Sequence, residues 1–450
     1  VPEAIARAGA EVLEVPLGEL AGSVADGRPN MVALGAVAAL GGLPVDALQA
    51  AVARTLQRKG AAAVTAAREC IALGHGRAPA GRTALPAAPA ASARRWNVSG
   101  NEACGVGALR GGVRFVAAYP ITPATELLEW LAPRIDAVGG ALLQAEDELA
   151  SINMVLGASF GGVPSLTATS GPGLSLMAEG LGLAVASETP VVVVDVMRGG
   201  PSTGIPTKSE QSDLNLAVYG LHGDAPHLVL APLSIADAAV TTEWAVGLAE
   251  HLQAPALVLS DQLIGQSRAI VDAPPALDLP LARRTAPAGP DGYARYALTP
   301  TGVSPMAVPG TPGCMYTADG LEHDEQGLPS SSAGDHRAQL HKRRHKLEAH
   351  DYGVLWGETA GRLTEQAEAV TAVGLRLLAP LPGAELARLV ARAARVLVVE
   401  QNHEGQLYRY LHACRALPAG AESYARPGPL PIRPADVVQA VRQGHRGQGQ

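Results

Sequence analysis

Residues able to do acid–base or anion-binding chemistry gather in four short segments of the sequence. The first is the acidic run Glu-Asp-Glu at 146–148, followed by Leu149, Ile152 and Leu156 at helical spacing. This pattern predicts a helix that opens at the acids. Acids in a first turn favour the helix dipole, and that structural role accounts for at least two of the three. Spacing does not decide which of them does more.

Two further segments have the sequence of turns between a strand and a helix. In Tyr-Pro-Ile-Thr-Pro at 119–123, Pro123 suits the first helical position and Thr122 suits the N-cap. Capping alone would explain Thr122, yet a helix N-terminus with a spare hydroxyl is also an anion site. In Ser-Gly-Pro-Gly at 170–173, the glycines would let a ligand approach the backbone closely, although any tight turn could have this sequence.

The fourth segment is a long loop stiffened by Gly and Pro, RGGPSTGIPTKSEQ at 198–211. It carries Arg198, Ser202, Thr203 and Lys208, which makes it better suited to binding an anionic substrate than to connecting two elements. The planar guanidinium of arginine fits a carboxylate through two parallel hydrogen bonds. The alternative is that Arg198 pairs with a surface acid.

The surrounding elements predict that the three turns at 119–123, 170–173 and 198–211 meet. In an open α/β sheet, ligands bind at the carboxyl ends of the strands, and all three turns follow strands. Apolar strands that alternate with helices predict a mostly parallel, doubly wound sheet over 97–270. The strands expected in this sheet are 113–118, 165–169, 191–196, 227–230 and 254–259.

The rest of the chain predicts four further parts. Residues 1–77 look mixed, and the Ala/Pro-rich stretch 78–96 predicts a semi-rigid linker. The stretch 271–350 is rich in Pro, Gly, Ser and His and predicts an irregular connection. A second, smaller α/β pattern occupies 351–445. The short elements expected outside the main sheet are a strand at 11–16, helices at 31–40 and 45–56, and strands at 375–378 and 396–400.

Composition narrows the class of protein. The chain has 450 residues, a net charge of −7 and 3% aromatic residues, which disfavours nucleic-acid binding. We also find no signal-peptide pattern and no apolar stretch long enough to cross a membrane. The four cysteines are widely separated, so they cannot hold an iron–sulfur cluster by themselves, and free thiols suit a reducing cytoplasm. They are Cys70, Cys104, Cys314 and Cys414.

Taken together, the segments resemble the alpha subunit of 2-oxoacid:acceptor (ferredoxin) oxidoreductases, most closely the 2-oxoglutarate synthase type. The resemblance runs from about residue 97 to near 440. Residues 1–77 resemble the end of the gamma domain that such subunits often carry, and we expect Val1 to be a fragment edge. The motifs that carry the resemblance are NEACGVGAL, YPITPATELLE, QAEDELASI, TATSGPGLSLMAEGLGLAV, RGGPSTGIPTKSEQSDL, GLEHDEQG and VVEQNHEGQL.

The resemblance implies a doubly wound domain that binds the pyrimidine of thiamine diphosphate, plus a smaller α/β domain like the C-terminal domain of transketolase. It implies the oxidative decarboxylation of 2-oxoglutarate to succinyl-CoA, with coenzyme A as co-substrate and ferredoxin as electron acceptor. The beta subunit would hold the diphosphate, Mg²⁺ and an iron–sulfur cluster. This chain has no convincing Gly-Asp-Gly loop, so we expect activity only with that partner, in a cytoplasmic heterodimer or dimer of heterodimers.

The resemblance also implies roles for individual residues. Glu148 matches the family's thiamine glutamate, which accepts a hydrogen bond from the pyrimidine ring, and Glu146 is the runner-up. Thr122 and Arg198 would bind the carboxylate beside the reacting carbon. We expect no metal ligand on this chain. The candidates for the remote carboxylate of 2-oxoglutarate are Ser202, Thr203 and Lys208, and the cofactor pocket would comprise Tyr119, Pro120, Thr122, Glu148, Ser170, Gly171 and Gly173.

Three alternatives remain open from the sequence. The same reaction could act on pyruvate or a branched-chain 2-oxoacid. A non-redox, transketolase-like thiamine enzyme would need its own diphosphate loop. A non-catalytic scaffold would only dock a partner, and it would tolerate the substitution Glu148→Gln.

Overall fold

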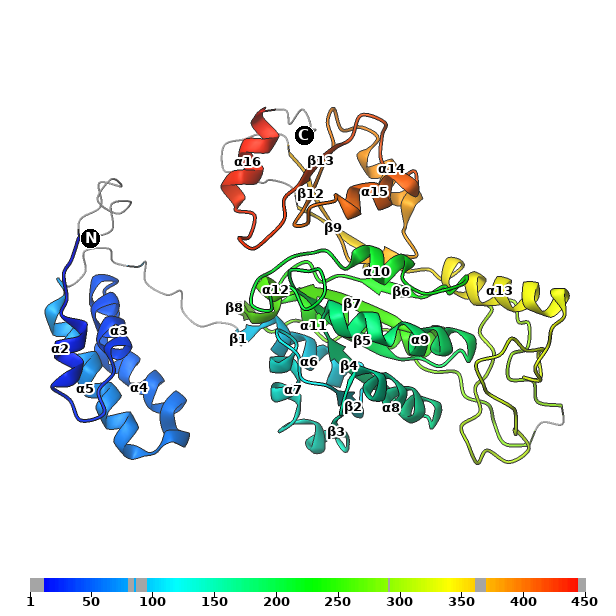
Figure 1. Cartoon of the computed structure of the whole chain (residues 1–450), viewed down its shortest axis with the longest axis horizontal. Helices are drawn as coiled ribbons and strands as arrows, with labels where there is room; N and C mark the ends of the chain where they lie inside the picture. The colour runs from blue at the N-terminus through cyan, green and yellow to red at the C-terminus, as the bar shows by residue number, and fades with distance from the viewer. Residues whose placement is uncertain (1–11, 80–84, 86–94, 290–291, 361–369, 444–450) are drawn as a thin grey trace. The chain divides into compact units, whose positions relative to one another are not determined.

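The chain folds as two units, Val1–Ser92 and Ala93–Gln450. Our computed structural model describes residues 12–79, 85, 95–289, 292–360 and 370–443 (Figure 1). Within those ranges no helix is long and apolar enough to span a bilayer. Cys70, Cys104 and Cys314 are buried free thiols, and Cys414 is an exposed one. Most of the predicted linker at 78–96 lies outside the described residues.

The first unit is helical over the residues that the structure describes. The helices predicted at 31–40 and 45–56 are confirmed, whereas the helix over Ala61–Arg77 was not predicted. The strand predicted at 11–16 is wrong over 12–16, where Val12 and Leu13 are exposed and the backbone forms no strand; residue 11 lies outside the described part. The helices are α2 (Leu17–Gly22), α3 (Pro29–Leu40), α4 (Val45–Leu56) and α5 (Ala61–Arg77), with a 3-10 turn at Gln57–Lys59.

Two glycines explain how α3 and α5 pack. A Cβ on Gly35 would lie 2.1 Å from the carbonyl oxygen of Ile71, and a Cβ on Gly74 would lie within 2 Å of the carbonyl oxygen of Val32. Both distances are far shorter than a carbon–oxygen contact allows. The two backbones therefore touch directly, and Val32 and Ile71 are fully buried beside them.

The second unit is built on a seven-stranded sheet with the order β11-β6-β7-β5-β4-β2-β3. All its neighbouring strands run parallel except β11, which pairs antiparallel with β6. The doubly wound sheet predicted for 97–270 is confirmed. Its strands are β2 (Phe115–Ala118), β3 (Ala141–Gln144), β4 (Ser165–Thr169), β5 (Val192–Met197), β6 (Leu228–Leu230), β7 (Ala256–Asp261) and β11 (Leu377–Ala379).

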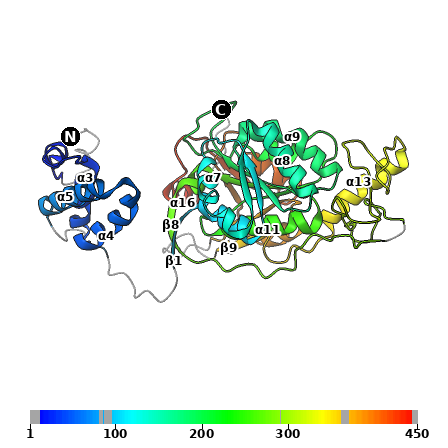
Figure 2. The same ribbon diagram turned by 90° about the horizontal axis from the view of Figure 1, so that it is seen from below.

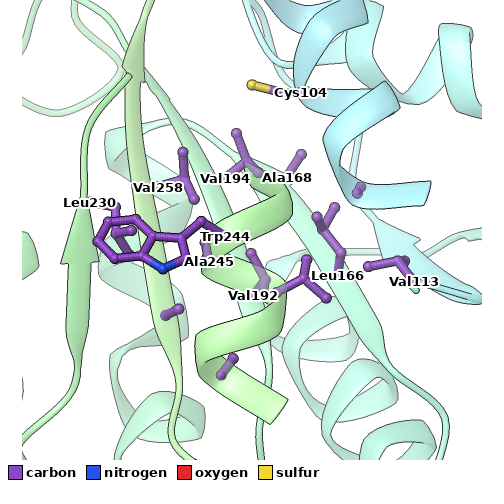
Figure 3. Close-up of a cluster of buried hydrophobic side chains, with 14 of the residues drawn as sticks. Cys104, Val113, Leu166, Ala168, Val192, Val194, Leu230, Trp244, Ala245 and Val258 are labelled. Carbon is purple, nitrogen blue, oxygen red and sulfur yellow. The ribbon is translucent and has the colours of Figure 1, made fainter. Parts of the chain in front are cut away.

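Helices cover both faces of this sheet. Along β5, Val192, Val194 and Val196 pack toward one face, whereas Val193 and Met197 pack toward the other. Figure 3 shows the first of these clusters, where Trp244 lies over the sheet. The first face carries α6 (Gly100–Arg110), α7 (Thr125–Leu131) and α11 (Asp237–Leu252), and the second carries α8 (Glu148–Phe160), α9 (Gly171–Ala186) and α10 (Leu214–Tyr219), as Figure 2 shows from below for α8 and α9.

The C-terminal part adds a smaller set of strands and helices. The strand predicted at 375–378 is split, because the strand over Ala372–Leu375 pairs with the strand over Gly357–Ala360 while β11 joins the edge of the main sheet. The strand predicted at 396–400 is β12, which pairs parallel with β13. The elements are β9 (Gly357–Ala360), β10 (Ala372–Leu375), α14 (Gly383–Val390), β12 (Leu397–Glu400), α15 (Gln406–Ala413), β13 (Glu422–Ala425) and α16 (Pro434–Gln443).

The stretch 271–350 is less irregular than predicted. It begins in β8 (Arg268–Asp272), which pairs antiparallel with β1 (Arg95–Ser99), and it ends in the helix α13 (Ala333–Glu348). A short helix, α12 (Gln262–Gln266), precedes it, and a 3-10 turn occupies Ile135–Val138.

Charged side chains hold α13 in place. Lys342 and Lys346 both form ion pairs with the buried Glu188, the second at 2.8 Å. Arg295 is fully buried and donates to the main-chain oxygen of Glu188 at 2.9 Å. Burial raises the pKa of Glu188, but the two lysines and Arg295 outweigh it and hold that pKa well below its ordinary value.

Candidate active site

The four segments selected from the sequence meet at one edge of the main sheet. They follow β3, β2, β4 and β5, which are consecutive neighbours in the sheet and run parallel. Their carboxyl ends therefore point the same way, which is where ligands bind in an open α/β sheet. The predicted gathering of the three turns that follow β2, β4 and β5 is what the backbone shows, whereas β3, the strand before the acidic run, was not predicted.

Glu148 stands out in the acidic run. Asp147 is the N-cap of α8, and its side chain accepts a hydrogen bond from the Ala150 N–H at 2.7 Å. Glu146 is exposed, whereas Glu148 is 7% exposed. Asp147 thus fulfils the capping role, and Glu148 is left as a buried carboxylate to which no described residue donates a hydrogen bond. Such a group is disposed to accept a hydrogen bond from a ligand.

The turn at 170–173 packs against this carboxylate. A Cβ on Gly173 would lie 2.7 Å from Glu148 Oε1 and 2.1 Å from Thr169 Oγ1. Only glycine fits there without displacing the carboxylate. Ser170 is the N-cap of α9, yet its side chain makes no capping bond, and its Oγ is buried without a partner among the described residues.

Arg198 joins the turn at 119–123 to the long loop. Its Nη1 donates to the carbonyl oxygen of Thr122 at 2.6 Å, and its Nη2 donates to the carbonyl oxygen of Thr203 at 2.8 Å. Arg198 is 6% exposed, so the alternative that it pairs with a surface acid is wrong. Its Nε is buried and has no partner in the described structure, which leaves a donor available.

The predicted N-cap role of Thr122 is wrong. Helix α7 begins at Thr125 with Ala124 as its N-cap, so Pro123 is not its first residue either. Thr122 is exposed, and its hydroxyl does not cap α7. The turn is anchored instead by the buried Asn101, whose Nδ2 donates to the Pro123 carbonyl at 2.9 Å. Nothing in the sequence distinguished Asn101 beyond its place in a family motif.

Ser202, Thr203 and Lys208 lie on the exposed part of the loop. The loop folds back on itself through Ile205 N–H to Gly199 O at 2.7 Å and Gly199 N–H to Lys208 O at 3.0 Å. The three side chains are therefore outside the core, and the structure does not bring them against Arg198 as a packed cluster.

The C-terminal part holds the far end of the same loop. Gln401 donates from Nε2 to Ser209 O at 2.8 Å, and Gln211 N–H donates to Gln401 O at 2.7 Å. Asn402 Nδ2 donates to Gln211 O at 3.0 Å, and Gln406 Nε2 donates to a loop carbonyl one residue later at 2.8 Å. The sequence assigned no role in the site to the motif VVEQNHEGQL, because its hydrogen bonds to the loop join segments about 190 residues apart.

Two aspartates near the loop were also missed. Asp195 is fully buried in β5, and Asp213 directly precedes α10. Burial, together with the nearby Asp213 carboxylate, raises the pKa of Asp195 well above its ordinary value. Burial raises the pKa of Asp213 to about 6. A lone acid inside the apolar run VVVVDVM was a signal that could have identified Asp195.

Comparison with known proteins places the chain in a family. Residues 106–342 match the family described as pyruvate flavodoxin/ferredoxin oxidoreductase, thiamine diphosphate-binding, and residues 1–76 match pyruvate ferredoxin/flavodoxin oxidoreductase. The fold is that of a thiamine diphosphate-binding oxidoreductase domain. The chain belongs to the pyruvate ferredoxin/flavodoxin oxidoreductase family, and the family and fold class expected from the motifs are confirmed.

Individual relatives agree with this assignment. The 2-oxoglutarate synthase subunit KorA of Methanothermobacter marburgensis is 34% identical over 369 residues, covering 76% of this chain and 97% of the relative. The 2-oxoacid:ferredoxin oxidoreductase 2, subunit alpha, of Aeropyrum pernix is 31% identical over 496 residues, covering 97% of this chain and 76% of the relative. The 2-oxoglutarate:ferredoxin oxidoreductase structure from Magnetococcus marinus, with 2-oxoglutarate, coenzyme A and succinyl-CoA bound, has a TM-score of 0.86 and 37% identity, covering 95% of this chain and 80% of that chain.

Proposed function

We propose that this chain is the alpha subunit of a 2-oxoglutarate:ferredoxin oxidoreductase, which converts 2-oxoglutarate and coenzyme A to succinyl-CoA with thiamine diphosphate. The observation that carries the proposal is the likeness to the Magnetococcus marinus enzyme, which holds 2-oxoglutarate, coenzyme A and succinyl-CoA and aligns over 95% of this chain. The buried Glu148 and the Arg198–Thr122 contact at the sheet edge support it.

The residues of the site fit the pyrimidine ring of the cofactor. Glu148 is a buried carboxylate without a donor in the described structure, and it packs directly against Gly173, where a Cβ would displace it. When bound, thiamine diphosphate supplies the carbon nucleophile that attacks the 2-oxo carbon. Glu148 would accept a hydrogen bond from the ring and so favour its imino form, which is proton control by a positioned carboxylate. Tyr119, Pro120, Ser170 and Gly171 would complete this pocket with Gly173.

Arg198 and Thr122 would bind the substrate carboxylate. The guanidinium has five N–H donors, of which two go to main-chain carbonyls, so three remain for an anion. The buried Nε is one of them. The loop also exposes the side chains of Ser202, Thr203 and Lys208. These side chains would be available to bind the remote carboxylate of 2-oxoglutarate.

The other half of the catalytic unit would lie on a beta subunit. Within the described residues no group of His, Cys, Asp and Glu could hold a metal ion. Relatives carry subunit names, which supports a partner chain. That partner would supply Mg²⁺, the diphosphate site and an iron–sulfur cluster, and ferredoxin would accept the electrons. The cytoplasmic location and the heterodimer or dimer of heterodimers stay predictions.

The domain boundaries are also part of the proposal. Residues 1–77 would be a remnant of the gamma domain, which the family match over 1–76 supports. Residues 97–270 would be the pyrimidine-binding domain, and 351–445 would be the transketolase-like C-terminal domain. Strand β11, which lies within 351–445, pairs with β6 at the edge of the main sheet.

The test is a substrate comparison with the complex of this chain and its beta subunit. Coenzyme A-dependent reduction of ferredoxin would be measured with 2-oxoglutarate, pyruvate and a branched-chain 2-oxoacid. We expect kcat/KM to be highest for 2-oxoglutarate. Equal or higher kcat/KM for another 2-oxoacid would contradict the assignment of substrate, and turnover by this chain alone would favour a transketolase-like enzyme.

A further inference from the structure

Asp195 presents a buried carboxyl group that the proposed reaction does not use. It lies in the middle of β5, in register with Thr169 of β4, and it is fully buried. Neither of its oxygens receives a hydrogen bond from any residue in the described part of the chain. An isolated charge in such a position is strongly disfavoured, so the group must find a proton or a partner.

Asp213 supplies that partner. Asp195 is in register with Thr169 and Asp213 packs against Gly171, so both carboxyl groups lie at the turn between β4 and α9, where each acts on the pKa of the other. Oδ2 of Asp213 is also buried, with no donor among the described residues. A Cβ on Gly171 would lie 2.7 Å from this oxygen, so Asp213 is pressed against the first turn of α9. Because two ionised carboxylates cannot hydrogen-bond to each other, the contact requires a proton between them.

The position of the pair along the chain gives it a mechanical role. Asp195 lies three residues before Arg198, where the long loop starts, and Asp213 lies where the loop ends. A hydrogen bond between the two carboxyl groups therefore fastens both ends of the loop at 198–213. The carbonyl oxygen of Thr203, which accepts a hydrogen bond from the Arg198 guanidinium, lies on the same loop.

Several charged groups face the pair. Arg198 is the cation whose charge acts on Asp213, and Glu210 is the anion that opposes its ionisation. Glu148 lies against Gly173, in the same α9 turn. At the end of β7, Asp261 accepts a hydrogen bond from Gln211 at 3.0 Å. Arg198 is the one cation among these groups, so ionisation of Asp213 lowers the positive charge available to a substrate anion.

We propose that Asp195 and Asp213 share one proton and that this carboxyl pair is a positioning group, which fastens the loop at 198–213 and so sets the place and the effective charge of Arg198. Its kinetic consequence rests on the proposed function. As pH rises through the pKa of Asp213, the pair gains a negative charge beside Arg198, so the KM for the anionic 2-oxoacid rises.

The kinetic test uses the complex with the beta subunit and compares Asp213→Ala with Asp213→Asn. We expect Asp213→Ala to raise the KM for 2-oxoglutarate about tenfold or more at neutral pH, because Arg198 loses its fixed place, with a much smaller change in kcat. The amide of Asp213→Asn can still donate to Asp195 and carries no charge, so this variant should restore a KM near the one that the unchanged chain has below the pKa of Asp213. It should also lack the rise in KM with pH. The exposed Asp278→Asn serves as the matched control.

An infrared measurement tests the shared proton without any activity. At neutral pH, the difference spectrum between the unchanged chain and Asp195→Asn should show the C=O band of a protonated carboxyl group. Absence of that band would overturn the proposal whether or not the complex acts on a 2-oxoacid. An unchanged KM in Asp213→Ala, or a rise in KM with pH retained in Asp213→Asn, would overturn it too. A complex inactive with every 2-oxoacid would instead refute the proposed function, and the infrared result would still decide the pair.

Discussion

The substitution Gly173→Ala probes the contact between the α9 turn and the Glu148 carboxylate. The added Cβ would lie 2.7 Å from Glu148 Oε1 and 2.1 Å from Thr169 Oγ1, whereas ordinary contact begins at 3.4 Å. The carboxylate or the turn must therefore move by about 0.7 Å, and Thr169 must move by more. A displacement of about 1 Å at a catalytic group costs up to about a hundredfold in rate.

We therefore expect Gly173→Ala to lower the kcat of the complex by about tenfold to a hundredfold. Overpacking should also destabilise the fold by about 1–3 kcal/mol. The assay is coenzyme A-dependent ferredoxin reduction at saturating 2-oxoglutarate, with thermal unfolding recorded in parallel. This pairing separates a displaced carboxylate from a simple loss of folded protein.

Gly157→Ala is the matched control, because it makes the same change within α8, and its Cβ would meet nothing within 4 Å. Alanine is the better helix former, so this variant should be slightly more stable and fully active. A Gly173→Ala complex with unchanged kcat would refute the reasoning, since it would mean that the carboxylate need not stay where the structure puts it.

Three further perturbations test other parts of the account. Glu188→Ala leaves the buried Lys342 and Lys346 without their ion pairs and should destabilise the chain by about 3–5 kcal/mol. The Tm of this variant should be lower than that of Glu179→Ala, which makes the same change at an exposed residue. An equal Tm for the two variants would contradict this. The pKa of Asp213 is about 6 in the folded chain and about 3.9 in the unfolded chain, so the native state binds more protons between these two pH values. The free energy of unfolding should therefore fall by about 3 kcal/mol as pH rises from the lower value to the higher one. Denaturant titrations of Asp213→Asn should lack that fall. Gln401→Ala removes the bond to Ser209 O, which should raise the KM for 2-oxoglutarate about fivefold with little change in kcat, and a fall in kcat alone would contradict the positioning role.

The sequence predicted the five central strands of the main sheet and the edge where the site lies, but not β3 or the place of β11 at the two ends of the sheet. Periodicity was sufficient because β4 and β5 are buried on both faces and the helix over Gly171–Ala186 follows a turn with clear glycine and proline signals. The assignment of Glu148 rested on family resemblance, since three adjacent acids look alike in a sequence. The structure separates them through burial and through the capping bond of Asp147.

What the sequence could not predict depends on contacts between distant segments. Helix α13 has almost no apolar stripe and reads as loop, yet Lys342 and Lys346 are buried because Glu188 lies beneath them. The hydrogen bond from Gln401 to the Ser209 carbonyl, at the far end of the loop, joins residues about 190 positions apart. Such pairings are set by tertiary packing, which local propensity does not encode.

The most direct test of the central claim is the turnover of two matched variants of the complex. Glu148→Gln removes the buried carboxylate at the start of α8, and Glu146→Gln makes the same change on an exposed residue two positions earlier. The account predicts that Glu148→Gln lowers the kcat with 2-oxoglutarate by about a hundredfold or more while Glu146→Gln leaves it unchanged. Equal turnover in both variants, or a loss confined to Glu146→Gln, would contradict it.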